Sequence, residues 1–252
     1  MNAILITVRT GSTRLPKKAL IEINGKTTIE HLIDRVKRSK LADDIILCTT
    51  NLHEDDILCR IAVKNGIKYY RGSIDDKLDR WSGACKEYNI DFFVTADGDD
   101  LFCEPELIDM AFEQYKTSNA DFIRAPGIIC GAFTHGIKTS ALEKVCEIKD
   151  TKNTEMHWVY FEETGLFNVY DLQNIPTEYI RNGIRMTLDY EDDLKFFTNI
   201  IDHFGEKKFG LSEIIYYINN NTSVAKINAH LEEQWSANQK ENLELKIKGK
   251  NE

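Results

Sequence analysis

The chain lacks an uninterrupted apolar stretch that could cross a membrane. No run approaches the length of about 18 apolar residues that a spanning helix needs. The first residues also lack the basic segment, apolar stretch and cleavage site of a secretory signal. None of the six cysteines forms a C-x-x-C pair, and most lie in apolar patterns. We therefore expect a cytoplasmic protein with no membrane insertion, whose cysteines are buried free thiols.

The excess of positive charge that general nucleic-acid binding requires is also lacking. Lys and Arg number 32 against 41 Asp and Glu, a net charge of −9, so we expect no nucleic-acid partner. Common phosphate-binding signatures are absent as well. The chain has no G-x-x-x-x-G-K-[ST] loop, and Gly11 stands outside any G-x-G-x-x-G pattern. Without internal repeats or a long linker, residues 1–252 are predicted to form a single domain.

What the sequence does contain is a regular alternation of two periodicities. Apolar positions at helical spacing separate short apolar runs, which predict strands over residues 3–8, 45–50, 67–70, 91–95 and 121–124. One predicted helix opens with a capping box at residues 27–30, another ends at Asn65-Gly66, and a third begins at Pro105. Alternating strands and helices predict an α/β fold with a mostly parallel sheet.

The pattern weakens between about residues 126 and 183, where short apolar pieces predict a small β insertion. It recovers with a predicted strand over 184–189, followed by two helices. From about residue 238 to 252 the chain is charged and low in aromatic residues, which predicts a frayed tail.

The stretch VRTGSTRLPKKAL, residues 8–20, concentrates positive charge after the first predicted strand. Residues 1–26 hold five Lys or Arg and a single acid, Glu22. Such a cluster in an acidic protein favours a small anionic ligand, although a solvated surface loop is the alternative. Backbone N–H groups of Gly11 and Ser12 can cradle phosphate oxygens, and Arg14 and Lys18 can neutralise a triphosphate.

Two further polar segments follow strands of the predicted sheet. Thr49-Thr50 ends the second strand, and Asp97-Gly98-Asp99 follows the fourth. Since ligands of parallel sheets bind beyond the carboxyl ends of the strands, we expect these segments to meet the basic loop at one edge. Carboxylates there suit Mg²⁺, and Asp189 offers another after the strand at 184–189. Asp192 and Asp193 are interpreted as acids that complement a helix dipole.

Together these motifs resemble a known family. RTGSTRLPKKAL is similar to the R-x-G-S-x-R-L-P-x-K motif of the cytidylyltransferases that activate sugar acids, the CMP-sialate and CMP-Kdo synthetases. The closest resemblance is to their spore-coat polysaccharide cytidylyltransferase-like branch. YRGSIDDKLDR, GDDLFCEPELID and RMTLDYEDDL resemble later motifs of that branch in the same order. The resemblance covers residues 3–125 and 183–205.

The resemblance implies a Rossmann-like nucleotidyltransferase (nucleotide-diphospho-sugar transferase) fold. It also implies CTP, Mg²⁺ and a homodimer formed through the insertion, whose apolar pieces at 128–133 and 166–172 lack an obvious burial partner. The implied reaction transfers CMP from CTP to a sugar acid or related acceptor, releasing pyrophosphate, for surface polysaccharide or glycoconjugate synthesis.

The motifs also imply site residues. The implied catalytic residues are Lys18, Arg14 and Asp99. The implied nucleotide-binding residues are Arg9, Gly11, Ser12, Arg14, Lys18, Thr49, Arg71, Asp76 and Arg80. The implied metal ligands are Asp99 and Asp189. TEMHWV resembles a family R-E-H-V segment, which implies acceptor contacts from Glu155 and His157, although a structural histidine is the alternative.

The chain departs from the family pattern at several positions. Lys17 stands where the family usually has Gly, Thr95 and Asp97 stand where close relatives have Arg and Thr, and Leu101 replaces Pro. These changes bear on the acceptor, for which a polyol phosphate, a sugar phosphate or a phosphonate are alternatives to an ulosonic or nonulosonic acid.

Two other functions remain open at this point. Asp97-Gly98-Asp99 is a D-x-D sequence, typical of metal-dependent nucleotide-sugar glycosyltransferases. That reaction has no need of the basic loop, which favours a triphosphate. A non-catalytic nucleotide-binding regulator is the third alternative, and the paired aspartates and Lys18 argue against it.

Overall fold

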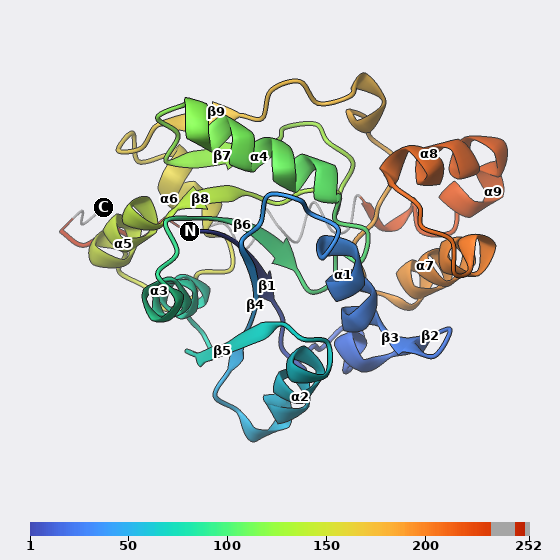
Figure 1. Cartoon of the computed structure of the whole chain (residues 1–252), viewed down its shortest axis with the longest axis horizontal. Helices are drawn as coiled ribbons and strands as arrows, with labels where there is room; N and C mark the ends of the chain where they lie inside the picture. The colour runs from blue at the N-terminus through green and yellow to red at the C-terminus, as the bar shows by residue number, and fades with distance from the viewer. Residues whose placement is uncertain (233–244, 250–252) are drawn as a thin grey trace.

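A computed structural model describes residues 1–232 and 245–249 and contains one central seven-stranded sheet (Figure 1). The strand order is β5-β4-β1-β6-β8-β7-β9. The first four of these strands in the sheet run parallel: β5 (Lys68–Gly72), β4 (Asp44–Thr50), β1 (Asn2–Thr7) and β6 (Phe92–Asp97). Beyond them lie β8 (Gly136–Lys138) and β7 (Phe122–Arg124), each antiparallel to its predecessor, and β9 (Val169–Asp171), parallel to β7. The mostly parallel sheet predicted from the sequence is confirmed.

Helices cover both faces of this sheet. The core on one face contains buried side chains of α1 (Thr28–Val36), α2 (Asp56–Lys64), α4 (Pro105–Thr117), α7 (Glu191–Phe204) and α8 (Leu211–Asn220). The other face packs against α3 (Lys77–Tyr88), α5 (Thr139–Ile148) and α6 (Trp158–Glu162). The short elements are η1 (Lys18–Leu20), β2 (Glu22–Ile23), β3 (Lys26–Thr27), η2 (His53–Asp55), η3 (Thr177–Tyr179) and α9 (Thr222–Ala225).

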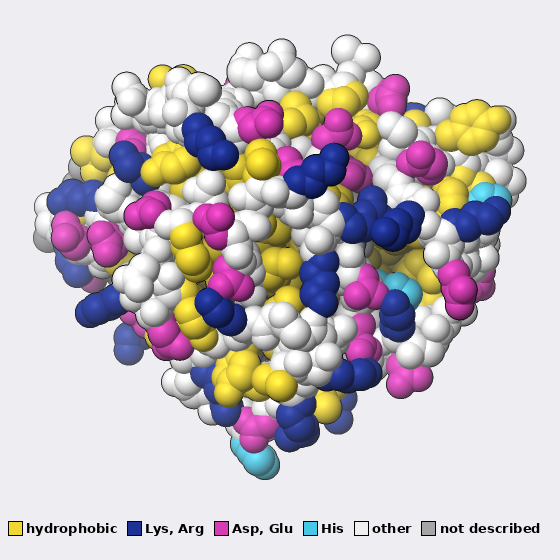
Figure 2. All heavy atoms as spheres, in the orientation of Figure 1, with side chains coloured by type: hydrophobic (Ala, Val, Ile, Leu, Met, Phe, Trp, Pro, Cys, Tyr) yellow, Lys and Arg dark blue, Asp and Glu magenta, His cyan; other side chains and the backbone are white. Residues whose placement is uncertain are grey.

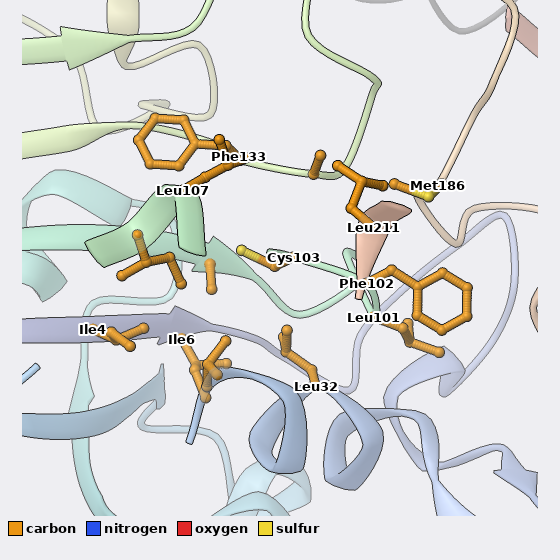
Figure 3. Packing of buried hydrophobic residues seen from close by; sticks show 14 of the residues in the cluster. Ile4, Ile6, Leu32, Leu101, Phe102, Cys103, Leu107, Phe133, Met186 and Leu211 are labelled. Atoms are coloured by element: carbon orange, nitrogen blue, oxygen red, sulfur yellow. The ribbon is translucent and has the colours of Figure 1, made fainter. Parts of the chain in front are cut away.

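Two hydrophobic cores follow from the alternation of side chains along each strand. Ile4 and Ile6 of β1 belong to the first core, whereas Ala3 and Leu5 belong to the second. In Figure 3 the first core continues from β1 through Leu32 and other apolar side chains of the neighbouring elements. A strand buried on both faces reads as a continuous apolar run, which is why these strands are visible in the sequence.

Several predicted boundary signals are confirmed. The Thr27 side chain accepts from the Glu30 N–H while the Glu30 carboxylate accepts from the Thr27 N–H, so α1 opens with the predicted capping box. Gly66 follows α2 with φ of 65°, and Pro105 stands at the first position of α4.

The strand predicted over residues 184–189 is wrong. The segment is extended, but it forms only a single bridge, between Arg185 and Cys130, and joins no strand of the sheet. Its alternating apolar side chains are buried in the first core, which explains the strand-like pattern. The place beside β6 is taken by β8, so the segment is held by the Leu188 N–H, which donates to the Asp99 carbonyl at 2.9 Å.

The apolar pieces of the insertion find burial partners within the chain. Ile129, Ala132 and Phe133 are buried in the first core, so the expectation that residues 128–133 lack a partner is wrong. In the second piece Leu172 is buried, whereas Leu166 and Tyr170 are exposed. The homodimer therefore loses part of its support and stays a prediction.

Part of the charged tail lies outside the described residues. Residues 245–249 are described, and they pair with the end of α5 rather than fraying. The Asp150 N–H donates to the Lys246 carbonyl at 2.9 Å, and the Lys248 N–H donates to the Ile148 carbonyl at 2.8 Å. Leu245 and Ile247 pack against the second core, which accounts for the attachment.

The composition-based expectations can be compared with the surface and the cysteines. All six cysteines are free, as predicted, and four of them are buried. Basic and acidic side chains are interspersed on the face drawn in Figure 2. Within residues 1–232 and 245–249, no helix combines the length and apolarity needed to cross a membrane.

Candidate active site

The basic loop meets the acidic turn after β6 at the carboxyl edge of the sheet. The Gly98 N–H donates to the Thr7 carbonyl at 2.8 Å, which holds the acidic turn beside the end of β1. A Cβ atom at position 98 would lie 2.7 Å from the Val8 side chain, so this close approach requires glycine. The predicted convergence of the two segments is confirmed.

Lys18 lies between the two aspartates that the sequence assigned to a metal. Its Nζ atom is 2.7 Å from Asp99 Oδ2 and 2.9 Å from Asp189 Oδ1. Arg14 contributes a second cation, 2.7 Å from Asp189 Oδ1. The structure thus brings together side chains from three segments that are far apart in the sequence.

The charges in this cluster shift each other's protonation. Burial by itself would lower the pKa of Lys18, but Asp99 and Asp189 outweigh burial and raise it. Burial raises the pKa of Asp99 despite Lys18. For Asp189 the balance is opposite: burial raises its pKa, but Lys18, Arg14 and Arg185 outweigh that effect and lower it. Asp189 is therefore the more firmly ionised of the two.

Lys17 adopts a left-handed backbone conformation, with φ of 52°, immediately before η1. Its side chain is exposed, whereas the side chain of Lys18 turns inward to the aspartates. A left-handed residue is most easily a glycine, which gives a physical reason for the glycine that the resembled family usually has here.

Asp55, which the sequence analysis missed, fixes the start of the basic loop. Its fully buried Oδ1 accepts from the Thr10 N–H at 2.8 Å and from the Thr10 hydroxyl at 2.7 Å. Its Oδ2 accepts from the Thr50 hydroxyl. Burial raises the pKa of Asp55, but these hydrogen bonds outweigh burial and lower it. Asp55 therefore ties the end of β1 to the end of β4.

The remaining residues of the basic loop lie on its outer side. The Ser12 N–H donates to the Thr10 carbonyl at 2.9 Å, and the Ser12 hydroxyl donates to the Leu15 carbonyl. Gly11 is exposed. Arg9 reaches across to Glu155, with 3.1 Å between Nη2 and Oε1. The loop therefore contacts the segment that the sequence assigned to the acceptor.

The residues of the second nucleotide-binding block make contacts that shape neighbouring loops. Arg71 donates to the carbonyls of Thr50 and Leu52, at 3.1 and 2.9 Å, and pairs with Asp56 at 2.7 Å. The Arg80 guanidinium donates to the Ser73 carbonyl. Thr49 is fully buried.

Asp76 of the same block is bound within the protein. Its carboxylate caps α3 by accepting from the Asp79 N–H at 3.0 Å. It also pairs with Lys149 and accepts from the Thr154 hydroxyl at 3.1 Å. These contacts place Asp76 at the junction of α3 with the segment after α5.

The acceptor-side histidine is buried. His157 is 1% exposed, and its Nε2 lies 3.2 Å from Nδ1 of His135. The Trp81 ring packs edge-on against it, with 4.8 Å between ring centroids. Burial, with Lys77 nearby, lowers the pKa of His157 well below its ordinary value and the pKa of His135 to about 3. Both imidazoles are therefore neutral at neutral pH.

Asp97 forms an ion pair with a different lysine from the one that Asp99 contacts. Its Oδ1 lies 2.8 Å from Nζ of Lys77, a residue at the start of α3 that the sequence analysis did not single out. The Lys77 side chain is 8% exposed and that of Asp97 is 28% exposed. Asp97 and Asp99 thus lie against different cations, which weakens the interpretation of residues 97–99 as a D-x-D metal motif.

The interpretation of Asp193 as a helix N-terminal acid is confirmed, because it lies in the first turn of α7 and its carboxylate accepts from the Tyr190 N–H at 3.0 Å. Asp193 is fully buried, and its Oδ1 lies 3.1 Å from Nε of Arg185. Asp192 lies in the same turn, but it is partly exposed and pairs with Lys195 at 2.7 Å. Sequence spacing distinguishes these neighbours poorly because the first turn of a helix can present its acids to solvent or inward.

The residues around Lys18 fit a magnesium ion. The described part of the chain contains no cluster of three or more His, Cys, Asp or Glu side chains that could hold a metal, so an ion here would depend on two carboxylates. Asp99 and Asp189 each direct one carboxylate oxygen at the Lys18 ammonium. Such a pair suits Mg²⁺, which proteins often bind through one or two carboxylates together with substrate phosphates.

Comparisons with known proteins agree with this geometry. The profile of a family described as cytidylyltransferase matches residues 3–235. An uncharacterized protein of Methanocaldococcus jannaschii is 33% identical over 91% of this chain and 95% of its own length. The spore coat polysaccharide biosynthesis protein SpsF of Bacillus subtilis is 27% identical over 89% of this chain and 98% of its own length.

Among solved structures, a cytidylyltransferase from Leptospira borgpetersenii superposes with a TM-score of 0.81. It is 29% identical and covers 89% of this chain and 96% of its own length. The sheet is accordingly that of the Rossmann-like nucleotide-diphospho-sugar transferase fold. The glycosyltransferase and regulator alternatives give way to this assignment: the chain belongs to the cytidylyltransferase family of CTP-dependent nucleotidyltransferases.

Proposed function

We propose that the protein transfers CMP from CTP to a sugar acid or a related acceptor, with release of pyrophosphate. The observation that carries the proposal is the position of Lys18, 2.7 and 2.9 Å from carboxylate oxygens of Asp99 and Asp189. A basic loop and two carboxylates at one point provide both the cations that a triphosphate needs and the oxygens that its magnesium ion needs.

In this proposal the basic loop binds the triphosphate. Arg14 and Lys18 neutralise the charge that develops on the departing pyrophosphate, and the Gly11 N–H contacts phosphate oxygens. The Ser12 N–H would join it by exchanging the Thr10 carbonyl, which it contacts at 2.9 Å, for a phosphate oxygen. Arg9 lies at the outer end of the same loop, beside Glu155. The protein contributes positioning and charge neutralisation, because in-line attack on the α-phosphorus needs no covalent intermediate on the enzyme.

Asp99 and Asp189 would hold Mg²⁺. When bound, the ion supplies charge compensation across the phosphate oxygens and lowers the pKa of the attacking hydroxyl. Asp189 suits this role because Lys18, Arg14 and Arg185 lower its pKa and keep it ionised. Asp55 supports the site indirectly, since it fixes Thr10 at the start of the loop.

Other residues of the nucleotide-binding block act by positioning in this proposal. Asp76 caps α3 and pairs with Lys149, while Arg71 holds the loop after β4. The base of CTP would lie against this framework.

In this proposal the acceptor side is formed by the segment around Glu155 and by the ion pair between buried Lys77 and partly exposed Asp97. A sugar acid is the acceptor that the motif resemblance implies, and the SpsF relative is named for polysaccharide biosynthesis. We extend that role, in surface polysaccharide or glycoconjugate synthesis, to this chain. His157 supports the acceptor side from within the protein, where it packs between Trp81 and His135.

The test is pyrophosphate release with Mg²⁺, measured for CTP, UTP, ATP and GTP across a panel of ulosonic acids, nonulosonic acids, sugar phosphates and polyol phosphates. We expect release that depends on both CTP and one class of acceptor. CTP should bind at least tenfold more tightly than the other nucleotides, about 1.4 kcal/mol. Equal use of all four nucleotides, or transfer from a nucleoside diphosphate sugar instead, would contradict the proposal.

A further inference from the structure

Arg185 lies directly behind Asp189 and belongs to none of the groups assigned so far. Its side chain is 1% exposed, and its Nη2 atom is 3.0 Å from Asp189 Oδ2. Its Nε atom is 3.1 Å from Asp193 Oδ1. The buried guanidinium therefore bridges the carboxylates of Asp189 and Asp193, which are four residues apart in the sequence.

Asp193 fixes the backbone of the same segment. Its Oδ2 accepts from the N–H groups of Asp189 and Tyr190, at 2.9 and 3.0 Å. The Asn228 amide donates to Asp193 Oδ1 at 2.9 Å and to the Arg185 carbonyl at 3.0 Å. Both the main chain and the side chain of Asp189 are thus held by one buried network.

The network gives the two oxygens of Asp189 different partners. Oδ2 is directed inward to Arg185, whereas Oδ1 is directed outward to Lys18 and Arg14. Rotation of the carboxylate to offer both oxygens outward would break the bond to Arg185 and leave a buried guanidinium without that partner. Because the rotation gives up a buried, charge-assisted hydrogen bond and leaves Arg185 with Asp193 as its remaining carboxylate partner here, it is disfavoured.

We propose that Arg185, held in place by Asp193 and Asn228, is a positioning residue that restricts Asp189 to binding the divalent cation through Oδ1 alone. The inference rests on the proposed function, since it presumes that Asp189 is a ligand. One oxygen from Asp189 leaves coordination positions for Asp99 and for phosphate oxygens, which suits an ion that must engage the substrate.

A purely structural role for Arg185 predicts a different result from a positioning role. The chain offers a matched control in Arg35, which is also buried and lies 2.8 Å from a buried carboxylate, that of Glu104. Arg35 also donates to the Phe209 carbonyl at 2.8 Å, and none of these partners belongs to the candidate site. Loss of either guanidinium disturbs a buried ion pair, but only one of the pairs includes Asp189.

The experiment measures Mn²⁺ affinity by electron paramagnetic resonance in the presence of CTP and without acceptor, for the wild type, R185K and R35K. Thermal unfolding is measured in parallel. Lysine keeps the charge but loses the forked geometry that contacts both carboxylates. We expect R185K to bind Mn²⁺ about 10- to 100-fold more weakly, as for other groups that orient metal ligands, and R35K to bind like the wild type.

The outcomes separate the inference from the proposed function. If the wild type binds no Mn²⁺ with CTP, the proposed metal site fails and the inference fails with it. If the wild type binds and R185K binds equally well, or R35K is weakened as much as R185K, the inference alone is wrong.

A second variant covers the case in which R185K does not fold. N228A removes the amide that contacts Asp193 and the Arg185 carbonyl, and it keeps the side chains of Arg185 and Asp189. We expect N228A to bind Mn²⁺ more weakly than the wild type by severalfold, with less effect than R185K. Wild-type Mn²⁺ affinity in folded N228A would overturn the role given to the network.

Discussion

The Nζ atom of Lys18 lies 2.7 Å from Oδ2 of Asp99, although 81 residues separate the two in the sequence. Asp189 accepts from the same ammonium at 2.9 Å. The lysine thus lies where the two proposed metal ligands converge. In the proposed reaction Lys18 binds the triphosphate and stabilises the negative charge that develops in the transition state.

Replacement of Lys18 by alanine should lower turnover far more than it weakens CTP binding. Removal of a group that stabilises developing charge costs on the order of 10²–10³ in kcat. Steady-state pyrophosphate release gives turnover, and calorimetry gives the CTP dissociation constant. Lys26→Ala is the matched control, because Lys26 pairs with Asp34 on the surface nearby and should behave like the wild type. Loss of CTP binding as large as the loss of turnover would show that Lys18 acts in ground-state binding only.

Lys17→Gly should stabilise the protein and leave turnover intact. Lys17 has φ of 52°, and a left-handed conformation costs a non-glycine residue on the order of 1–2 kcal/mol. The free energy of unfolding, from urea titration, should therefore rise by about 1 kcal/mol. Lys37→Gly is the control, since Lys37 is in the right-handed helical region and should lose stability on the same change. A greater loss of turnover in Lys17→Gly than in Lys18→Ala would show that the loop register is wrong.

Asp97→Asn should reduce stability more than it reduces chemistry. The substitution leaves Lys77, 8% exposed, without its carboxylate 2.8 Å away, and breaking a buried pair costs about 3–5 kcal/mol. Because Asp97 is partly exposed, we expect the loss of unfolding free energy to be near the lower end of that range. The double variant Lys77→Met with Asp97→Asn should recover most of the loss in urea unfolding. Turnover that falls as far in folded Asp97→Asn as in Asp99→Asn would return Asp97 to a metal-binding role.

The buried histidines should make the protein sensitive to acid. Burial holds the pKa of His135 at about 3 and the pKa of His157 well below its ordinary value. In the unfolded chain both would take up protons near about pH 6.5. Between that pH and the folded-state pKa values the unfolded state binds more protons, so the free energy of unfolding falls as the pH falls. The contribution of the neutral histidines is complete above about pH 6.5.

Each histidine contributes a slope of up to about 1.4 kcal/mol per pH unit. In urea unfolding between pH 7.5 and 5, His157→Gln should therefore show a shallower pH dependence than the wild type. The pH dependence that comes from carboxylates is the same in both proteins and cancels in this comparison. His53→Gln is the control for the loss of an exposed histidine, because the His53 side chain is 99% exposed. An unchanged slope in His157→Gln would contradict the assignment.

The sequence predicts the parts of this fold that local chemistry determines. The apolar runs of β1, β4 and β6 and the capping box of α1 are local signals, and the structure contains them. The extended segment at 184–189 imitates a strand because alternate side chains are buried, yet β8 pairs with β6 in its place. Strand pairing is decided by tertiary packing, which periodicity does not report.

In the candidate site, too, some residues could be predicted from the local sequence and others depend on tertiary contacts. Charged motif residues such as Lys18 and Asp189 could be singled out because nothing in a core requires them. Asp55, Lys77 and Asp193 could not, because their partners are Thr10, Asp97 and Arg185, and two of these pairs join different segments of the chain. A buried carboxylate and a surface carboxylate look alike in a sequence, and the difference lies in the partner that the fold supplies.

The shared metal site is the central claim, and a double-mutant cycle tests it most directly. Two ligands of one ion act as a unit, so their effects are not additive. Steady-state pyrophosphate release from CTP with Mg²⁺ is measured for the wild type, Asp99→Asn, Asp189→Asn and the double variant. The account predicts that each single variant loses most of the turnover and that the double variant is little worse than either. Effects that simply multiply, or an Asp189→Asn variant near the wild type, would contradict it.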